Sequence, residues 1–219
     1  MAKKLLTEQS VIEASKRRDN KIIVEDDTLI TDAARDRAGQ LGIVIERKKH
    51  SVVINTASTP ALNSQPGAKE TIAIASDHGG FGLKEQLRAY LTSLGYNVVD
   101  LGTNNEEPCD YPDFAYAVGS MVSKHTASRG IMIDTLGIAS AMVANKITGI
   151  RAACCFDEFS ARSSREHNNA NVLTLGGKTI GVELAKSIIK VWLDTSYAGG
   201  RHQKRLDKLT EIEKRFLKT

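Results

Sequence analysis

From residue 70 onward, short apolar runs alternate with stretches in which apolar residues recur at helical spacing, as Leu83, Leu87 and Leu91 do. Near-continuous apolar strands separated by helices are typical of βαβ units, whose parallel sheet is covered by helices on both faces. The runs occupy residues 71–75, 96–99, 130–133, 150–155 and 171–175. We therefore expect an α/β fold: a Rossmann-like, five-stranded parallel sheet sandwiched by helices, with a last helix at about 201–217.

Residues 51–69 break this rhythm and are predicted to be a linker. They hold two of the four prolines, with Ser, Thr, Asn and Gly around them, a composition that favours irregular chain. We expect a small N-terminal α+β module over residues 1–50 and the larger domain over residues 70–219.

The N-terminal module contains two helical patterns, over residues 7–18 and from Thr31 to a stop at Gly42. The inner face of the second helix is expected at Ala34, Ala38 and Leu41, and short strands are expected at residues 21–24 and 43–45. So few large apolar side chains make a marginal core. We therefore expect this module to dock on another surface.

Composition excludes several classes of protein. Hydrophobic residues make up 41% and charged residues 26% of the 219, as in ordinary globular proteins. The net charge of +4 and the aromatic content of 5% do not support nucleic-acid binding. No apolar stretch reaches the roughly 20 residues of a membrane span, and the N-terminus has no apolar signal core. Adjacent Cys154 and Cys155 suit a reducing compartment, so we expect a cytoplasmic protein with no membrane partner.

In open parallel sheets, ligands bind beyond the carboxyl ends of the strands, so the residues after each run form the candidate site. Asp77 and His78 follow the first run and precede two glycines and a helix start, whose free N–H groups can bind an anion. The alternative is a capped helix start with a solvated histidine. The sequence has neither a dinucleotide fingerprint nor a P-loop. The other strand-end segments are residues 100–103, 134–137 and 176–178.

Histidine and arginine residues elsewhere could serve the same edge of the sheet. His167 could move a proton near neutral pH, or lie at the end of a surface helix. Arg201 and Arg205 lie one helical turn apart and could clamp a phosphate, or begin a solvated basic helix. Tyr111 with the following proline could simply start a helix.

Taken together, these segments resemble the B-type ribose-5-phosphate isomerase family, which includes the galactose-6-phosphate isomerase subunits. The resemblance covers about residues 70–215. The matching segments are SDHGGFGLKEQL (76–87), DLGT (100–103), DYPDFA (110–115), ANKITGIRAA (144–153), SREHNNANVLTLGGK (164–178) and GGRHQKR (199–205).

The resemblance implies interconversion of aldose and ketose phosphates through an enediolate, without a metal or other cofactor. It implies that Asp77 and His167 help to open the sugar ring, and that the protein is a homodimer or a larger oligomer with shared active sites. Of the binding residues, it places Tyr111 and Asn168 on the sugar, and His78, Lys178, Arg201 and Arg205 on the phosphate, the two arginines coming from a neighbouring subunit.

The catalytic loop departs from the family pattern. Where the family carries Cys-Gly-Thr-Gly-Ile-Gly, this chain has Asp-Thr-Leu-Gly-Ile-Ala at 134–139. Asp134 stands at the position of the proton-abstracting cysteine. The loop whose N–H groups bind the enediolate keeps only Gly137 and Ile138 of the family pattern, and Thr135 still provides an N–H and an extra hydroxyl group. Leu136 should narrow the site and favour a different or shorter sugar. Lys178 replaces a usual arginine and keeps the charge without the bidentate fork.

Two outcomes are open for this loop. Asp134 is the catalytic base, because a buried carboxylate can abstract a proton next to a carbonyl. Alternatively, the loop has lost its donors, and the chain is a sugar-phosphate-binding paralogue or a partner subunit of an isomerase complex. Cys109 has no assigned role, and Cys154 and Cys155 are interpreted as packing residues.

The N-terminal module has a resemblance of its own. The segments LLTEQSVIEA (5–14) and ITDAARDRAGQLGIVIE (30–46) are similar to segments found ahead of some bacterial microcompartment-associated enzymes. This would imply that residues 1–50 dock the protein to a microcompartment. The alternative is a helical extension that covers the oligomer surface.

Overall fold

The structure is a computed structural model that describes residues 5–25, 28–48 and 70–216. The chain divides into two compact units, residues 1–67 and 68–219, which are described separately. The predicted linker at 51–69 lies outside the described residues. Among the helices of the described ranges, none is long and apolar enough to cross a membrane.

The first unit is α+β, with two helices and two pairs of parallel strands. Thr7 and Thr31 cap the two helices with their hydroxyl groups, and Gly42 ends the second helix with φ of 67°. Ala34 and Ala38 are buried as predicted, but Leu41 is 42% exposed, because it occupies the last, outward-facing turn of its helix. The elements are β1 (Leu5–Leu6), α1 (Glu8–Lys16), β2 (Lys21–Glu25), β3 (Leu29–Ile30), α2 (Asp32–Leu41) and β4 (Val44–Lys48), with β1 beside β3 and β2 beside β4.

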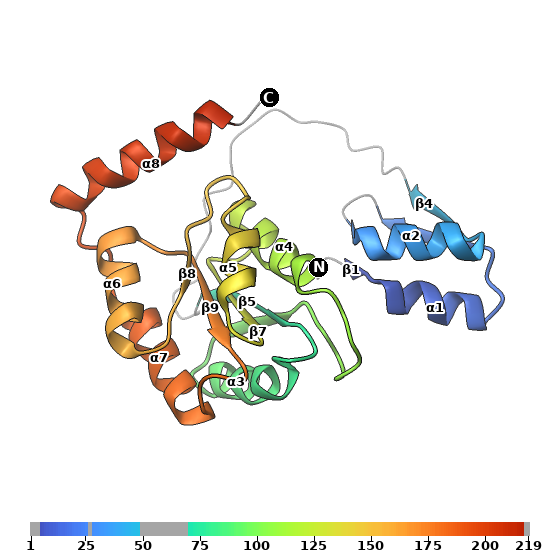
Figure 1. The fold of residues 1–219 in the computed structure, drawn as a ribbon, viewed down its shortest axis with the longest axis horizontal. Coiled ribbons are helices and arrows are strands. Elements are labelled where there is room, and N and C mark those ends of the chain that lie inside the picture. Colours follow the sequence, from blue (N-terminus) through green and yellow to red (C-terminus); the bar gives the residue numbers. More distant parts are fainter. Residues whose placement is uncertain (1–4, 26–27, 49–69, 217–219) are drawn as a thin grey trace. The chain divides into compact units, whose positions relative to one another are not determined.

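The second unit is a three-layer α/β sandwich, as expected (Figure 1). Its five strands are all parallel, in the order β6-β5-β7-β9-β8. The strands are β5 (Thr71–Ser76), β6 (Asn97–Asp100), β7 (Arg129–Asp134), β8 (Ala152–Cys154) and β9 (Val172–Gly176). The helices are α3 (Phe81–Ser93), α4 (Tyr111–Ser123), α5 (Ile138–Ala144), α6 (Glu158–Asn168), α7 (Val182–Asp194) and α8 (Gln203–Phe216), with a 3-10 turn, η1 (Gly200–His202).

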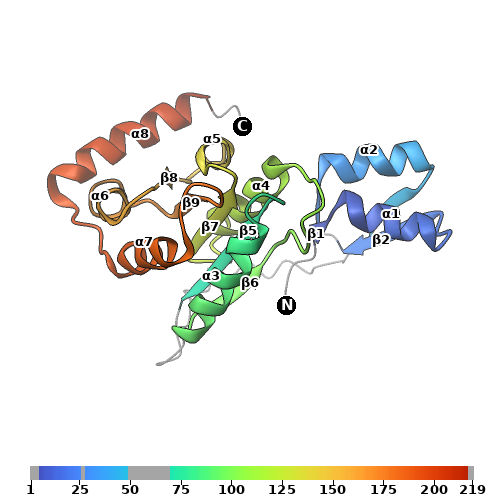
Figure 2. The ribbon, with the colours of Figure 1, turned by 60° about the horizontal axis from the view of Figure 1, so that its bottom comes forward.

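Helices cover both faces of the sheet, so the central strands are apolar throughout. The helices α4 and α5 pack on one face, and α3, α6 and α7 form the layer on the other (Figure 2). Ile72, Ile74, Ile131 and Ile133 are fully buried at the centre, and Trp192 of α7 is the largest side chain of this core. Burying side chains of this size stabilises the unit by about 1.5–3 kcal/mol each.

The last helix differs from expectation at its start. Residues 200–202 form a 3-10 turn, and α8 begins only at Gln203. Leu206, Leu209, Ile212 and Phe216 recur at helical spacing along α8, but only Leu206 is buried, and Phe216 is 82% exposed. Figure 1 shows α8 projecting from its unit. Glu213 accepts the Gly149 N–H at 2.8 Å, and the other three apolar side chains remain largely exposed.

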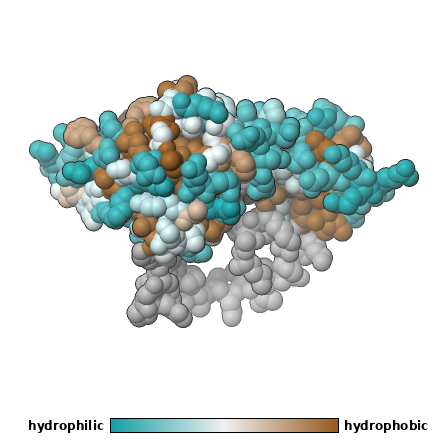
Figure 3. Space-filling view, turned by 90° about the horizontal axis from the view of Figure 1, so that it is seen from below, coloured by the Kyte–Doolittle hydropathy of each residue, from teal (hydrophilic) through white to brown (hydrophobic). Residues whose placement is uncertain are grey.

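Other large apolar side chains also reach the surface. Met142 is 63% exposed and Phe159 81%. In the view of Figure 3, apolar residues form patches among polar ones. Contiguous apolar surface of this kind marks interaction sites.

Candidate active site

The candidate site lies where the chain changes direction in the sheet. From β5 the chain passes to β6 on one side, and then to β7 on the other side of β5. The loops after β5 and β7 therefore diverge above neighbouring strands, which is where open α/β sheets bind ligands. The loop after β9 joins them, because Gly177 N–H donates to Asp134 C=O at 2.7 Å and Lys178 N–H to Thr135 C=O at 3.1 Å.

Two glycines allow the loops after β5 and β7 to touch. A Cβ on Gly80 would lie 2.4 Å from the carbonyl oxygen of Ile133. A Cβ on Gly79 would lie 2.6 Å from Thr135 Oγ1 and 3.3 Å from Asp77 Oδ1. The two predicted residues Asp77 and Thr135 thus flank the backbone of Gly79, at a spacing that a side chain would prevent.

Asp77 is a buried carboxyl group with few donors. It is 5% exposed, and one oxygen accepts the Gly80 N–H at 2.9 Å. Burial raises its pKa above the ordinary 3.8, and the nearby Asp134 charge adds to this, whereas the Gly80 N–H and the His78 charge oppose it. A carboxyl group with a raised pKa can hold a proton closer to neutral pH, as a general acid requires.

His78 is exposed at the same edge and contacts the loop before α4. Its Nδ1 accepts the Cys109 N–H at 3.2 Å, and the Cys109 sulfur lies 3.9 Å from the same nitrogen. No pattern in the sequence predicts the contact between Cys109 and His78, because Cys109 lies in a loop of irregular structure. Tyr111 begins α4 two residues further on and is half-buried.

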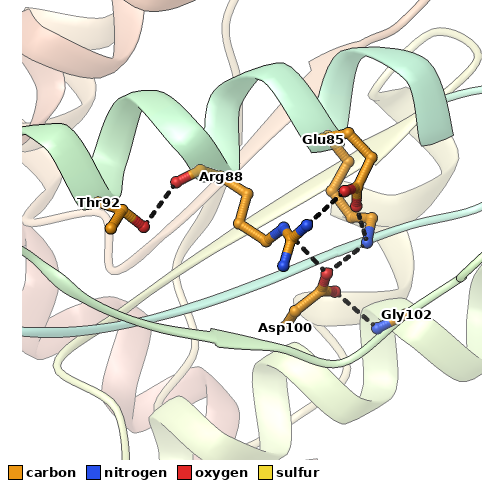
Figure 4. A network of polar contacts seen from close by, with 6 residues as sticks. Glu85, Arg88, Thr92, Asp100 and Gly102 are labelled. Carbon is orange, nitrogen blue, oxygen red and sulfur yellow. Dashed lines mark hydrogen bonds and ion pairs between the residues drawn. The ribbon is translucent and has the colours of Figure 1, made fainter.

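A buried lysine is linked to the loop after β5 by a network of polar contacts (Figure 4). Lys84 of α3 is fully buried, and its ammonium group lies 2.6 Å from Asp100 Oδ2 and 2.9 Å from Glu85 Oε1. The other Asp100 oxygen accepts the Gly102 N–H at 2.9 Å. Gly102 C=O in turn accepts the N–H of Ser76, the residue before Asp77, at 2.7 Å. Hydrogen bonds thus connect the buried ion pair to the start of the site.

Asp134 ends β7, and its carboxylate turns into its own loop. The side chain is 4% exposed. One oxygen accepts the N–H groups of Leu136, at 2.8 Å, and of Gly137; the other accepts the Ser140 N–H at 2.9 Å and its hydroxyl at 2.5 Å. We call these four donors the Asp134 cradle. The resemblance assigns the binding of the enediolate to N–H groups of this same loop.

Two of the three loop residues are exposed, whereas Gly137 is buried and closely packed. Thr135 and Leu136 are exposed, so Leu136 closes no pocket within one chain. Gly137 has φ of 81°, and a Cβ there would lie 2.9 Å from the Cys154 sulfur. Cys154 is therefore a packing residue behind the loop, as interpreted from the sequence.

A second group of predicted residues gathers at the end of α6. The rings of His167 and His202 stack with centroids 4.3 Å apart, and Arg201 Nε donates to His202 Nε2 at 3.4 Å. Arg201, Arg205, Asn168 and Lys178 are exposed. His202 carried no signal of its own in the sequence, because its partner lies on another element.

The predicted residues thus form two groups. Asp77, His78, Asp134, Thr135, Gly137 and Lys178 are connected through the loops after β5, β7 and β9, whereas His167 is connected to Arg201 through His202. Within the described ranges, no cluster of three or more His, Cys, Asp or Glu side chains could hold a metal ion.

Known proteins resemble the second unit throughout. Residues 72–209 match the family described as Ribose/Galactose Isomerase. Ribose-5-phosphate isomerase B of Escherichia coli is 44% identical over 144 residues, which are 66% of this chain and 97% of that protein. D-erythrulose-4-phosphate isomerase of Pectobacterium atrosepticum is 40% identical over 145 residues, which are 65% of this chain and 95% of that protein.

Solved structures agree with the sequence relatives. The structure of Clostridium thermocellum ribose-5-phosphate isomerase B superposes with a TM-score of 0.67 at 45% identity, covering 67% of this chain and 99% of that one. The family match spans more than half of the chain and includes both groups of site residues. The chain therefore belongs to the ribose/galactose isomerase family, whose members are aldose–ketose isomerases of sugar phosphates.

Proposed function

We propose that this protein interconverts the aldose and ketose forms of a small phosphorylated sugar through an enediolate intermediate. The observation that carries the proposal is the Asp134 cradle: a carboxylate at the strand end, held by donors that can equally hold an enediolate oxygen. Family membership supports the reaction class.

The base in this proposal is Asp134. When its carboxylate takes the proton from the carbon next to the carbonyl, Asp134 becomes neutral and the substrate oxygen becomes negative. The Leu136, Gly137 and Ser140 donors then pass from the carboxylate to the enediolate, so they face one negative charge throughout. Preorganised donors of this kind stabilise developing charge at a small reorganisation cost. The hydroxyl proton on the neighbouring carbon then passes to the oxyanion, so that the negative charge moves to the second enediolate oxygen. Return of the abstracted proton from Asp134 to the former carbonyl carbon leaves a new carbonyl group on the neighbouring carbon and completes the isomerisation.

Other residues bind the substrate and open its ring. The raised pKa of Asp77 suits it to deliver a proton to the ring oxygen, with His167 as its partner in ring opening. The exposed imidazole, ammonium and guanidinium groups form the phosphate site. They belong to His78, Lys178, Arg201 and Arg205, with Tyr111 and Asn168 on the sugar hydroxyls.

The substrate in this proposal has four or five carbons. The relatives include proteins named for ribose 5-phosphate, D-erythrulose 4-phosphate and galactose 6-phosphate, at identities of 44%, 40% and 40%, so identity alone does not choose the length of the sugar. The bulk of Leu136 at the catalytic loop favours the shorter sugars once a second copy covers it.

The active site in this proposal is shared between two copies in a homodimer or larger homo-oligomer. His167 and Arg201 are joined within one chain through His202, so they enter a site together. The exposed apolar face of α8 gives the second copy a surface to cover.

A second candidate function follows from the same cradle. If the Asp134 carboxylate never leaves its four donors, then no anion hole is open and the protein binds sugar phosphates without turning them over. Such a chain would be a binding paralogue or a partner subunit beside an active isomerase.

Purified protein incubated with four- to six-carbon sugar phosphates separates the two candidates. We expect conversion of at least one of them by the wild-type chain, and loss of more than about a thousandfold in kcat for Asp134→Asn with binding unchanged. If the wild type binds but does not convert, and Asp134→Cys does convert, the second candidate is correct. If no sugar phosphate binds, both are wrong.

For residues 1–50 we propose a docking role toward a larger enzyme assembly such as a microcompartment. The small separate core of this unit and its lack of predicted catalytic residues support the proposal. A chain that begins at residue 68 should keep its isomerase activity and lose co-localisation with the assembly. Unchanged co-localisation would refute the docking role.

A further inference from the structure

The ring of His167 is held from two directions. Its Nδ1 lies 3.2 Å from the Ser163 hydroxyl, one turn earlier on α6. Its face lies against His202 of η1, with 4.3 Å between ring centroids and 9° between ring planes. A hydrogen bond fixes one edge of an imidazole, and a stacked ring fixes its plane. Together they leave the ring little freedom to turn.

The protonation of His202 follows from its neighbour. Arg201 Nε donates to His202 Nε2 at 3.4 Å. A guanidinium N–H can only donate, so Nε2 must accept, and the single proton of the ring lies on Nδ1. The ring stacked on His167 is therefore a neutral imidazole.

The charges around His202 agree with this assignment. The side chain is 8% exposed, and burial lowers its pKa first. The positive charges of His167, Arg201 and Arg205 lower the pKa further, and only Glu166 raises it. The His202 ring thus contacts His167 through its face and the Arg201 guanidinium through Nε2.

We infer that His202 is a positioning residue: it sets the ring plane of His167 for ring opening and links that ring to Arg201 of the phosphate site. This rests on the proposed function, which gives His167 and Arg201 their roles. The link runs within one chain, from Arg201 through His202 to His167 and Ser163. A phosphate bound at Arg201 is therefore connected, through His202, to the ring-opening group His167.

If His202 positions His167 for ring opening, a change at His202 should affect the turnover of sugars that form rings more than the turnover of sugars that cannot. Ribose 5-phosphate closes to a furanose through its O4 and must be opened before the proton transfer. Erythrose 4-phosphate carries its phosphate on O4, so no furanose forms and no opening step is needed. A defect in the position of His167 should slow the first substrate and spare the second.

Two variants separate the stacking contact from the hydrogen bond. His202→Ala removes both, whereas His202→Phe keeps a flat ring against His167 and removes the acceptor of the Arg201 N–H. With ribose 5-phosphate we expect His202→Ala to lower kcat at least about tenfold, because a positioned general acid contributes 10²–10⁴-fold. With erythrose 4-phosphate its kcat should stay within about twofold. His202→Phe should keep kcat and raise KM for both substrates.

Proton NMR of the full chain without substrate gives a readout that does not depend on activity. The stacked ring shifts the His167 Cε1–H resonance; His202→Ala should abolish this shift, and His202→Phe should retain it. Lys204→Ala, an exposed charge on the same segment, is the matched control and should change neither the resonance nor the kinetics.

Equal losses of kcat on both substrates in His202→Ala, or an unchanged His167 resonance, would overturn the positioning role. A wild-type chain that converts no sugar phosphate would refute the proposed function instead. In that case the NMR comparison alone still supports or overturns the contact between His202 and His167.

Discussion

Two aspartates end neighbouring strands of the same sheet and are equally buried, yet their surroundings differ. Asp77, after β5, is 5% exposed and accepts the N–H of Gly80. Asp134, at the end of β7, is 4% exposed and accepts four donors, two from the following loop and two from Ser140 in α5. Burial by itself therefore does not tell what a carboxylate does.

The difference lies in the chain after each aspartate. After Asp77 the backbone passes through His78 and two glycines into α3, and one carboxylate oxygen accepts the Gly80 N–H. After Asp134 a short loop leads into α5, and both the loop and the first turn of the helix donate to the carboxylate. In the first arrangement burial raises the pKa of the carboxyl group, and in the second four hydrogen-bond donors fix the position of the carboxylate.

The largest expected effect is a loss of stability when the acceptor of the Asp134 cradle is removed. Asp134→Ala leaves the N–H groups of Leu136, Gly137 and Ser140 without their acceptor, and we expect the free energy of unfolding to fall by about 3 kcal/mol. Asp77→Ala deprives the Gly80 N–H of its acceptor and should cost about 1 kcal/mol. Urea unfolding of both variants measures the difference. Equal losses would mean that the cradle does not hold the loop.

The next effect concerns the contact between the two loops. A Cβ on Gly80 would lie 2.4 Å from the carbonyl oxygen of Ile133, and Gly80→Ala should destabilise the protein by about 2 kcal/mol through overpacking. Gly82→Ala is the control, since no heavy atom lies within 4 Å of its added Cβ and it stands in the first turn of α3. It should stabilise the chain by about 0.5–1 kcal/mol. Thermal denaturation tests the pair, and a stable Gly80→Ala would show that the loops can separate.

The sheet and its flanking helices could be predicted from the sequence because period and apolar content determine them. A strand buried on both faces must be apolar along its length, and residues 71–75 and 130–133 show this directly. The ends of the strands then mark the edge where a ligand binds, so the candidate residues follow without knowledge of their contacts.

The contacts within the site could not be predicted, because they depend on where separate elements meet. His202 contacts His167 only because α7 returns the chain to the end of α6. The direction of the Asp134 carboxylate depends on the path of its loop. Leu41 and Phe216 carry the right spacing for a buried face, but spacing does not tell whether anything covers that face.

A smaller effect is expected when only one donor of the Asp134 cradle, the Ser140 hydroxyl, is removed. Ser140→Ala removes the hydroxyl that donates to Asp134 at 2.5 Å but keeps the Ser140 N–H. We expect a loss of about 1 kcal/mol, since one of four donors is gone. Ser93→Ala, which removes an exposed hydroxyl bonded to its own helix, should change the stability by less than about 0.5 kcal/mol. A loss in Ser140→Ala no greater than in Ser93→Ala would show that the backbone donors suffice.

The last prediction uses pH to test whether Asp77 is the less satisfied carboxyl group. Its folded pKa is raised by burial, so the folded chain binds the Asp77 proton more tightly than the unfolded chain does. The stability that this proton contributes is present in full below the ordinary pKa of 3.8 and is lost as the pH rises through the folded pKa. Asp77→Asn cannot ionise and keeps its stability over this range. The difference in unfolding free energy between wild type and Asp77→Asn should therefore move in favour of the variant as the pH rises from 3.8, and then level off.

Urea unfolding of both proteins at matched pH measures this difference and cancels the titration of the other groups. A difference that instead moves in favour of the wild type would mean that the Gly80 N–H and His78 outweigh burial, and that the folded chain holds the Asp77 carboxyl group as an anion.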